Sequence, residues 1–246
     1  MNYDWDWGIF FAHTFTGAGR YVDWMLAGLA LTIGIGLAAW LFALLLGVVL
    51  GVARTLPSRT LRLLVASYVE LFRNIPLLVQ LFFWYYIAPA LLLPQAWQRA
   101  LGEAHPVLVQ AGTVIGCLGL FTAARVCEQV RAGIEAQPRG QFNAGYALGM
   151  TRTQVYRHVI LPMALRMIVP PLTSEFLNVF KNSAVALTIG LLELTAQSRQ
   201  IGEFTGHIIE AFVVATLLYF LIAQVTTYLM HRLERRLALP GAGAAR

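Results

Sequence analysis

Two groups of polar side chains interrupt stretches of the sequence that are otherwise apolar. The groups are Glu70, Arg73 and Asn74, and then Glu175, Asn178, Lys181 and Asn182. Spacings of three, four or seven residues place side chains on one face of a helix, and Lys181 borders the second face. A guanidinium or ammonium can hold a carboxylate, and a carboxylate can hold an ammonium. The two faces are therefore candidates for lining a path taken by a ligand that carries both groups.

The same charges also have a structural interpretation, which stays open beside the first. Glu70 with Arg73, and Glu175 with Lys181, can neutralise each other and hold helices together. A role in gating is a third alternative. Charged groups at membrane depth are energetically costly, so side chains of this kind are by default candidates for a functional role.

The composition indicates a membrane protein. The chain has 246 residues, of which 58% are hydrophobic and only 12% are charged, whereas a soluble domain has roughly 25% charged residues. The net charge is +6, and the basic residues lie in short segments between the apolar stretches. That spacing is typical of the positive-inside pattern and argues against a surface that binds nucleic acid.

Five apolar segments are long enough to cross a bilayer, since a spanning helix needs roughly 20 residues. They cover residues 24–52, 63–88, 107–127, 165–192 and 208–230. The sequence therefore predicts an all-α membrane protein with about five transmembrane helices. Pro76 can break the second segment, and Pro170 and Pro171 can kink the start of the fourth.

The basic residues also predict the orientation. One side of the predicted bundle receives Arg54, Arg59, Arg62, Arg131, Arg139, Arg152, Arg157, Arg166, Arg232, Arg235, Arg236 and Arg246. This side is expected to be cytoplasmic, which places the N-terminus outside. The start of the chain lacks the basic region of a signal peptide, so the first apolar segment is expected to remain as an anchor. We expect a periplasmic tail at 1–23, a transmembrane domain at 24–230 and a cytoplasmic tail at 231–246.

Small residues and isolated polar residues predict how the helices pack. The GxxxG spacing, which lets helices approach closely, occurs at Gly47 and Gly51 and again at Gly112 and Gly116. Arg125 and Glu128, at i and i+3, are expected to form an ion pair. Cys117 and Cys127 are interpreted as small hydrophobic residues. No metal-ligand motif is found among the cysteines and histidines.

The polar segment 138–166 predicts a cytoplasmic loop with structure of its own. Residues 141–148 can form a short helix, and Gly149 can end it. A second helical run follows, and Pro162 stands where the chain is expected to re-enter the bilayer. A short helix with apolar side chains on the cytoplasmic face is suited to fit a groove on a partner.

This loop resembles the cytoplasmic coupling loop, or EAA loop, of ABC importer permeases. The matching residues are Asn143, Ala144, Gly149, Ile160, Leu161 and Pro162. The chain departs from that pattern at the acidic position, because no Glu lies between Gln141 and Gly149. The departure puts a salt bridge from that position in doubt.

Three further stretches carry the resemblance. Residues 68–86 and 169–194 resemble the second and fourth spans of polar amino acid permeases, and 120–134 resembles glutamate/aspartate importers. The resemblance implies a type I ABC importer permease in the bacterial inner membrane. It also implies an ATP-binding subunit, a second related permease and a periplasmic solute-binding protein as partners. Glutamate, aspartate and glutamine remain open as substrates.

The chain lacks the features of a nucleotide site. A P-loop needs glycines before its lysine, and Lys181, the single lysine, has no glycine at those positions. We therefore expect no enzyme activity or cofactor in this chain, with ATP and magnesium on the separate ATPase. A transporter that works alone and an intramembrane enzyme are the alternatives. The coupling loop argues against the first, and the absence of Asp from the five segments argues against the second.

Overall fold

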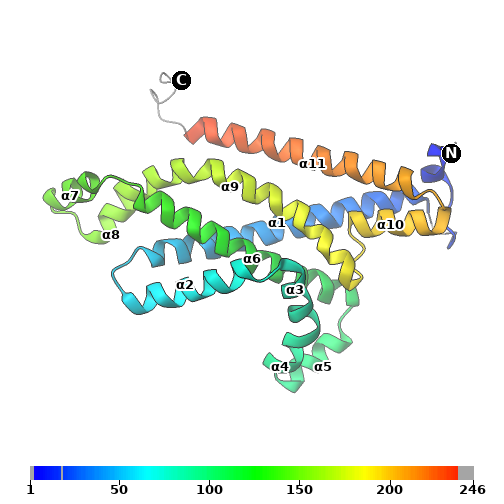
Figure 1. Cartoon of the computed structure of the whole chain (residues 1–246), viewed down its shortest axis with the longest axis horizontal. Coiled ribbons are helices and arrows are strands. Elements are labelled where there is room, and N and C mark those ends of the chain that lie inside the picture. Colours follow the sequence, from blue (N-terminus) through cyan, green and yellow to red (C-terminus); the bar gives the residue numbers. More distant parts are fainter. Residues whose placement is uncertain (1–2, 18, 238–246) are drawn as a thin grey trace. The chain divides into compact units, whose positions relative to one another are not determined.

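The computed structural model describes residues 3–17 and 19–237. The first two residues of the predicted outer tail, and residues 238–246 of the predicted inner tail with Arg246, lie outside this range. Every regular element in the described range is a helix (Figure 1). The elements are η1 (Trp7–Phe11), α1 (Tyr21–Arg54), α2 (Arg59–Asn74), α3 (Leu77–Phe82), η2 (Phe83–Ile87), α4 (Ala88–Leu92), α5 (Gln95–Glu103), α6 (Pro106–Glu135), α7 (Arg139–Ala147), α8 (Arg152–Val155), η3 (Tyr156–Ile160), α9 (Leu161–Ser183), η4 (Ala184–Ile189), α10 (Leu194–Thr205) and α11 (Ile208–Leu237).

Four helical runs are long and apolar enough to cross a membrane. They are α1, α6, the run Arg152–Ile189 and α11, and a broken span made of α2 and the helices up to Leu92 gives a fifth. The predicted segments 24–52, 107–127 and 208–230 lie inside α1, α6 and α11. The prediction of about five spans is confirmed.

The second span is broken where the sequence predicted it. α2 ends at Asn74, and Ile75 and Pro76 have extended backbones before α3 begins at Leu77. Proline has no N–H to donate to the preceding turn, and it disfavours helical conformation in the residue before it. The predicted segment 63–88 is therefore not one continuous helix.

The helix that contains the fourth apolar segment starts well before that segment. The helical run begins at Arg152, so the second helical run predicted in the loop continues through Pro162 into the span. Entry into the bilayer at Pro162 stays a prediction. A π-helical turn, η3, ends two residues before this proline and widens the helix there. Pro170 and Pro171 also lie inside α9, away from its start. The run ends at Ile189, because the next residue, Gly190, has a left-handed φ of 82° that favours glycine. The predicted end at about residue 192 is therefore three residues too late.

The chain divides into two compact units. The first consists of Met1–Leu41, Pro76–Gly119 and Asn178–Gln224. In it, one core gathers side chains of α1, α3, α6, α9 and η4 around Ile35, Leu81 and Leu118. A second core joins η1 and α1 to α10 and α11.

The second unit consists of Phe42–Ile75, Leu120–Leu177 and Val225–Arg246. Here α1 and α6 pack closely through the predicted GxxxG motif. A Cβ on Gly47 would lie 2.6 Å from the Cβ of Val126, and one on Gly51 would lie 2.6 Å from the Cβ of Val130. This packing prediction is confirmed.

The other GxxxG motif does not pack in the same way. Within the described chain, a Cβ on Gly112 or Gly116 would meet nothing within 4 Å. The spacing alone does not show which glycines face a neighbouring helix.

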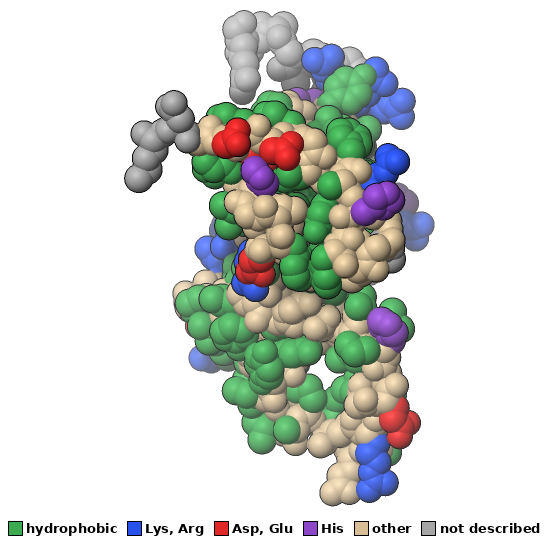
Figure 2. Space-filling view, turned by 90° about the vertical axis from the view of Figure 1, so that its right-hand side faces the viewer, with side chains coloured by type: hydrophobic (Ala, Val, Ile, Leu, Met, Phe, Trp, Pro, Cys, Tyr) green, Lys and Arg blue, Asp and Glu red, His purple; other side chains and the backbone are tan. Residues whose placement is uncertain are grey.

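The sides of the long helices expose large apolar side chains, such as Leu45 of α1 and Leu217 of α11. An apolar outer surface is expected where helices face lipid. Figure 2 looks along the long helices, and there hydrophobic side chains are mixed with other side chains while the charged ones form small separate groups.

Candidate functional site

The predicted coupling loop folds as two short helices joined by a tight turn. α7 ends before Gly149, whose φ of 74° is left-handed and favours glycine. The N–H of Gly149 donates to the carbonyl of Tyr146, and that of Met150 donates to the carbonyl of Gly145. The helix stop predicted at Gly149 is confirmed. α8 then starts at a capping box formed by Thr151 and Gln154.

The two loop helices pack against each other, and η3, which follows them, contacts the connection between α1 and α2. A Cβ on Gly145 would lie 2.8 Å from Val155, so the absence of a side chain lets α7 approach α8. The rings of Phe142 and Tyr156 lie 6.0 Å apart. The Tyr156 hydroxyl donates to the carbonyl of Thr55 at 3.3 Å. Figure 1 shows α7 and α8 at the same end of the second unit as the α1–α2 connection.

The residues matched to the coupling loop fall into two environments. Asn143, Ala144 and Gly149 are exposed, whereas Ile160 is fully buried. Leu161 is partly buried and Pro162 is exposed. Two apolar side chains beside the matched positions also point outward, since Leu148 is 77% exposed and Tyr146 is 44% exposed. The loop therefore presents an apolar surface, with Ile160 as part of its support.

A polar cluster joins α6 to α9 inside the second unit. Glu175 is buried, and the Gln129 side-chain amide donates to its carboxylate at 3.3 Å. The Arg125 guanidinium lies 3.8 Å from the same carboxylate and 4.9 Å from the ring centre of Phe121. Glu175 thus pairs with Arg125 and Gln129, and its predicted pairing with Lys181 stays a prediction.

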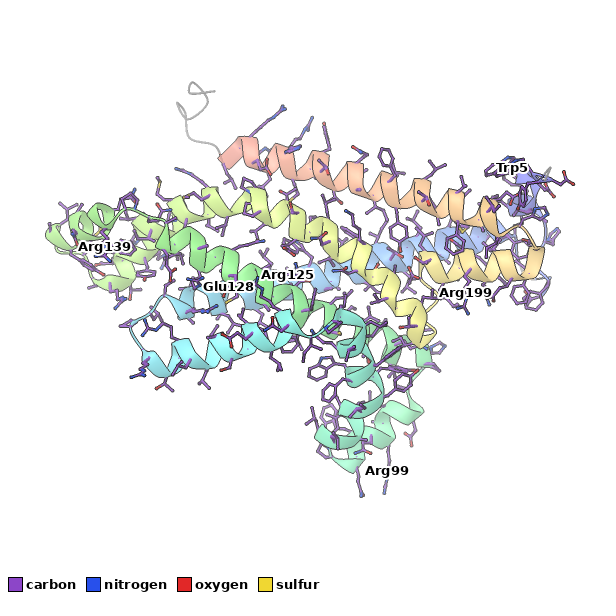
Figure 3. All side chains as sticks on the ribbon, in the orientation of Figure 1. Trp5, Arg99, Arg125, Glu128, Arg139 and Arg199 are labelled. Carbon is purple, nitrogen blue, oxygen red and sulfur yellow. The ribbon has the colours of Figure 1, made fainter. Side chains whose placement is uncertain are left out.

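Glu128 is the centre of a second ion-pair cluster in this unit. It pairs with Arg54 of α1 and with Arg131 of its own helix, and the Arg131 contact is 2.9 Å long. The predicted pair between Arg125 and Glu128 is therefore wrong. Figure 3 labels both side chains on α6. Glu128 has two arginines at helical spacing on α6, but it pairs with only one of them and takes its other partner, Arg54, from α1.

The remaining members of the two predicted polar faces differ in exposure. Glu70, Arg73 and Asn74 are all exposed on α2, and neither Glu70 nor Arg73 takes part in an ion pair within the described chain. Lys181 is exposed, while Asn178 and Asn182 are partly buried. The structural pairing of Glu70 with Arg73 is not formed. That the two faces line one path stays a prediction.

A buried carboxyl in the first unit was not singled out from the sequence. Glu193 is fully buried and caps α10 by accepting hydrogen bonds from the backbone N–H groups of Thr195 and Ala196, at 3.0 and 2.9 Å. The hydroxyl of Tyr219 donates to it at 2.9 Å. Burial raises the pKa of the Glu193 carboxyl above its ordinary value. The sequence signal that could have found Glu193 is its position just before a helix, where an acidic side chain can cap the first turn.

The start of the chain is fixed by another buried carboxylate. Glu210 is fully buried at the first turn of α11 and accepts hydrogen bonds from the Tyr3 hydroxyl, at 2.5 Å, and from the Asp6 N–H. These bonds hold the segment from Tyr3 to Asp6 against α11.

Cys117 and Cys127 are buried and free, as expected of small hydrophobic residues.

Comparison with known proteins decides the family. The family described as "binding-protein-dependent transport system inner membrane component" matches residues 43–239. This chain belongs to that family. The permease is thus a multi-pass component of the inner membrane, as the sequence predicted.

Several curated relatives cover most of the permease. The glutamate/aspartate import permease protein GltJ of Escherichia coli (strain K12) is 46% identical over 241 residues, or 98% of each chain. The probable glutamine ABC transporter permease protein GlnM of Bacillus subtilis (strain 168) is 34% identical and covers 78% of this chain and 83% of its own length. The glutamate/aspartate import permease protein GltK of Escherichia coli O6:H1 is 31% identical, with coverages of 88% and 95%.

Solved structures share the fold. An amino acid ABC transporter crystallised with histidines is 30% identical, with a TM-score of 0.74 over 88% of this chain and 95% of its own. The MetNI methionine ABC transporter is 22% identical, with a TM-score of 0.65 over 89% and 96%. The fold class predicted from the sequence, an all-α type I ABC importer permease, is confirmed.

Proposed function

We propose that this permease is the transmembrane subunit of an importer for glutamate or aspartate. The observation that carries the proposal is the 46% identity to a glutamate/aspartate import permease over nearly the whole of both chains. Relatives named for glutamine, cystine and arginine are 30 to 34% identical. The identity therefore favours an acidic amino acid over these alternatives.

Transport is driven by ATP hydrolysis on a separate subunit, which binds ATP and magnesium. The exposed side chains of Tyr146 and Leu148, with Ala144 beside them, form the docking surface for that subunit. Apolar side chains on a short rigid helix suit a groove on a partner, because little conformational entropy is lost on binding. The hydrogen bond from Tyr156 to Thr55 would pass movement of the docked loop to α1.

The other partners are a second, related permease and a periplasmic solute-binding protein. The pair of import permeases named GltJ and GltK, both similar to this chain, supports the second permease. The family description supports the binding protein. Residues 1–23 and 231–246 are then the periplasmic and cytoplasmic tails of a transmembrane domain at 24–230.

The substrate path includes Arg125, which extends the set predicted from the sequence. Its side chain is 41% exposed although it is paired with Glu175, so a carboxylate of the substrate can reach the guanidinium. An acidic amino acid brings two carboxylates and one ammonium, which Arg125 and Glu175 complement. Arg73 and Lys181 are further exposed cations for the same path, and Glu70, Asn74, Asn178 and Asn182 complete it.

Uptake into proteoliposomes tests the substrate. The complete importer is reconstituted with ATP, and uptake of labelled glutamate is measured against excess aspartate, glutamine, arginine or cystine. Competition by aspartate but not by glutamine or arginine supports the proposal. Uptake of glutamine or arginine in preference to glutamate would overturn the substrate while leaving the family unchanged.

A further inference from the structure

A basic cavity lies in the second unit, where α1 ends and α2 begins. Its volume is about 350 Å³. The lining residues are Arg54, Arg59, Arg62, Leu63, Ala66, Arg131 and Glu135. Four of these seven side chains are guanidinium groups, and a single carboxylate stands among them.

The charges of the cavity do not balance. Arg54 and Arg131 share the carboxylate of Glu128, and Arg131 also contacts Glu135 at 2.5 Å. Arg59 and Arg62 form no ion pair within residues 3–17 and 19–237. Two carboxylates therefore face four guanidinium groups, which leaves an excess of two positive charges.

The local backbone increases this excess. Arg59 and Arg62 occupy the first turn of α2, which contains no acidic residue. The N-terminus of a helix carries partial positive charge, so acidic residues are favoured there and basic residues are not. An anion in the cavity would relieve repulsion that no group of the described chain relieves.

The surroundings of the cavity indicate the form of the anion. Leu63, in the lining, is 58% exposed, and its neighbour Leu64 is 66% exposed. A charged cavity beside exposed leucines at a helix end matches a lipid headgroup with acyl chains next to it. Basic pockets between helices at the cytoplasmic surface bind phospholipid headgroups in this way.

We propose that this cavity binds a phosphate group, supplied by the headgroup of an anionic phospholipid. The guanidinium fork of arginine suits phosphate oxygens, because it can donate two parallel hydrogen bonds. Thr55, between Arg54 and Arg59, accepts the hydrogen bond of Tyr156 from the coupling loop. The bound phosphate thus holds the connection on which that loop rests.

The test uses the complete importer in nanodiscs. In one arm, phosphatidylcholine discs contain a fraction of phosphatidylglycerol, and native mass spectrometry measures how much phosphatidylglycerol the released protein retains. In the other arm, discs of phosphatidylcholine alone receive inorganic phosphate, and the broadening of its phosphorus resonance reports binding. The first arm detects a lipid source and the second a soluble one.

The pocket variant is Arg59→Gln/Arg62→Gln, and the matched control is Arg235→Gln/Arg236→Gln, which removes two basic charges from α11 outside the cavity. We expect the pocket variant to retain about thirtyfold less phosphatidylglycerol, since each arginine near an anionic surface contributes about fivefold. The control should retain it like the unchanged protein. Arg59→Lys/Arg62→Lys, which keeps the charge, should lose less than the glutamine variant.

Each outcome decides the proposal. Retention that depends on Arg59 and Arg62 supports the lipid source. Broadening of the phosphate resonance that depends on the same arginines, without retained lipid, supports the phosphate site with a soluble ligand. Equal losses in the pocket and control variants would show only a diffuse basic surface and overturn it. Binding unchanged in the pocket variant would overturn it as well.

Discussion

The Arg125 guanidinium of α6 lies 3.8 Å from the Glu175 carboxylate of α9. The two side chains differ in exposure, at 41% for Arg125 and 12% for Glu175. Removal of the arginine leaves a largely buried carboxylate with less compensation, whereas removal of the acid leaves a cation that water can reach. We expect Arg125→Gln to lower stability by about 1–3 kcal/mol and Glu175→Gln to lower it by less. Thermal unfolding of the purified permease measures both, and equal losses would contradict the account.

Transport by the double variant separates the two roles of this pair. If Arg125 and Glu175 only neutralise each other, then Arg125→Gln/Glu175→Gln should fold and transport normally. The path proposed above predicts a folded protein whose uptake of glutamate falls about tenfold or more, since a charge-assisted contact contributes more than 1 kcal/mol. Normal uptake by the folded double variant would remove both residues from the path.

The two GxxxG motifs predict opposite effects of added methyl groups. A Cβ on Gly47 would lie 2.6 Å from the Cβ of Val126 and 2.9 Å from a backbone oxygen. Gly47→Ala should therefore force α1 and α6 apart and cost about 1–3 kcal/mol. Gly112→Ala meets nothing within 4 Å in the described chain, and it should be neutral or stabilise by up to about 1 kcal/mol. A detergent-unfolding series on both variants checks this, and similar losses for the two would contradict the assigned packing.

Glu128 should be the most sensitive member of its ion-pair cluster. It is 19% exposed and pairs with Arg54 and Arg131. Glu135 is 53% exposed, and Arg131 is its one ion-pair partner among the described residues. Glu128→Gln should lower the free energy of unfolding by about 2 kcal/mol. Glu135→Gln, the control, should change it by less than about 1 kcal/mol. A larger effect of the control would show that the centre of the cluster is misplaced.

Glu193 predicts a pH dependence of stability. Its pKa is raised in the folded protein from an ordinary value of 4.5. A raised pKa means that ionisation costs the folded state, so this contribution to stability is present below pH 4.5 and is lost as pH rises through the raised pKa. Glu193→Gln cannot ionise, and its unfolding temperature should fall less over the same pH rise. Parallel pH profiles of the two proteins would contradict the assignment.

The spans and the coupling loop could be predicted from the sequence because their signals are local. Long apolar runs predict α1, α6 and α11, Pro76 predicts the break after α2, and Gly149 predicts the end of α7. The spans follow from the apolar interior of the bilayer. The break and the helix end follow from the backbone conformations that proline and glycine favour.

The pairing of charges could not be predicted in the same way. Glu128 has Arg125 and Arg131 at helical spacing, but the third arginine, Arg54, comes from another helix. Glu175 has no arginine on its own helix at such spacing and takes Arg125 of α6. Tertiary packing decides which arginine lies near each acid. The sequence contains no signal for that packing, so it does not predict which arginine forms the ion pair.

Coupling to ATP hydrolysis tests the central claim most directly. The permease is reconstituted with its ATP-binding subunit, sister permease and binding protein, and ATPase activity is measured with and without glutamate. The test variant is Tyr146→Ala/Leu148→Ala, and the matched control is Leu91→Ala, which truncates an exposed leucine of α4. The account predicts that glutamate stimulates hydrolysis in the unchanged and control proteins and that stimulation falls about tenfold in the loop variant. Full stimulation in the loop variant, or no association with the ATP-binding subunit, would contradict it.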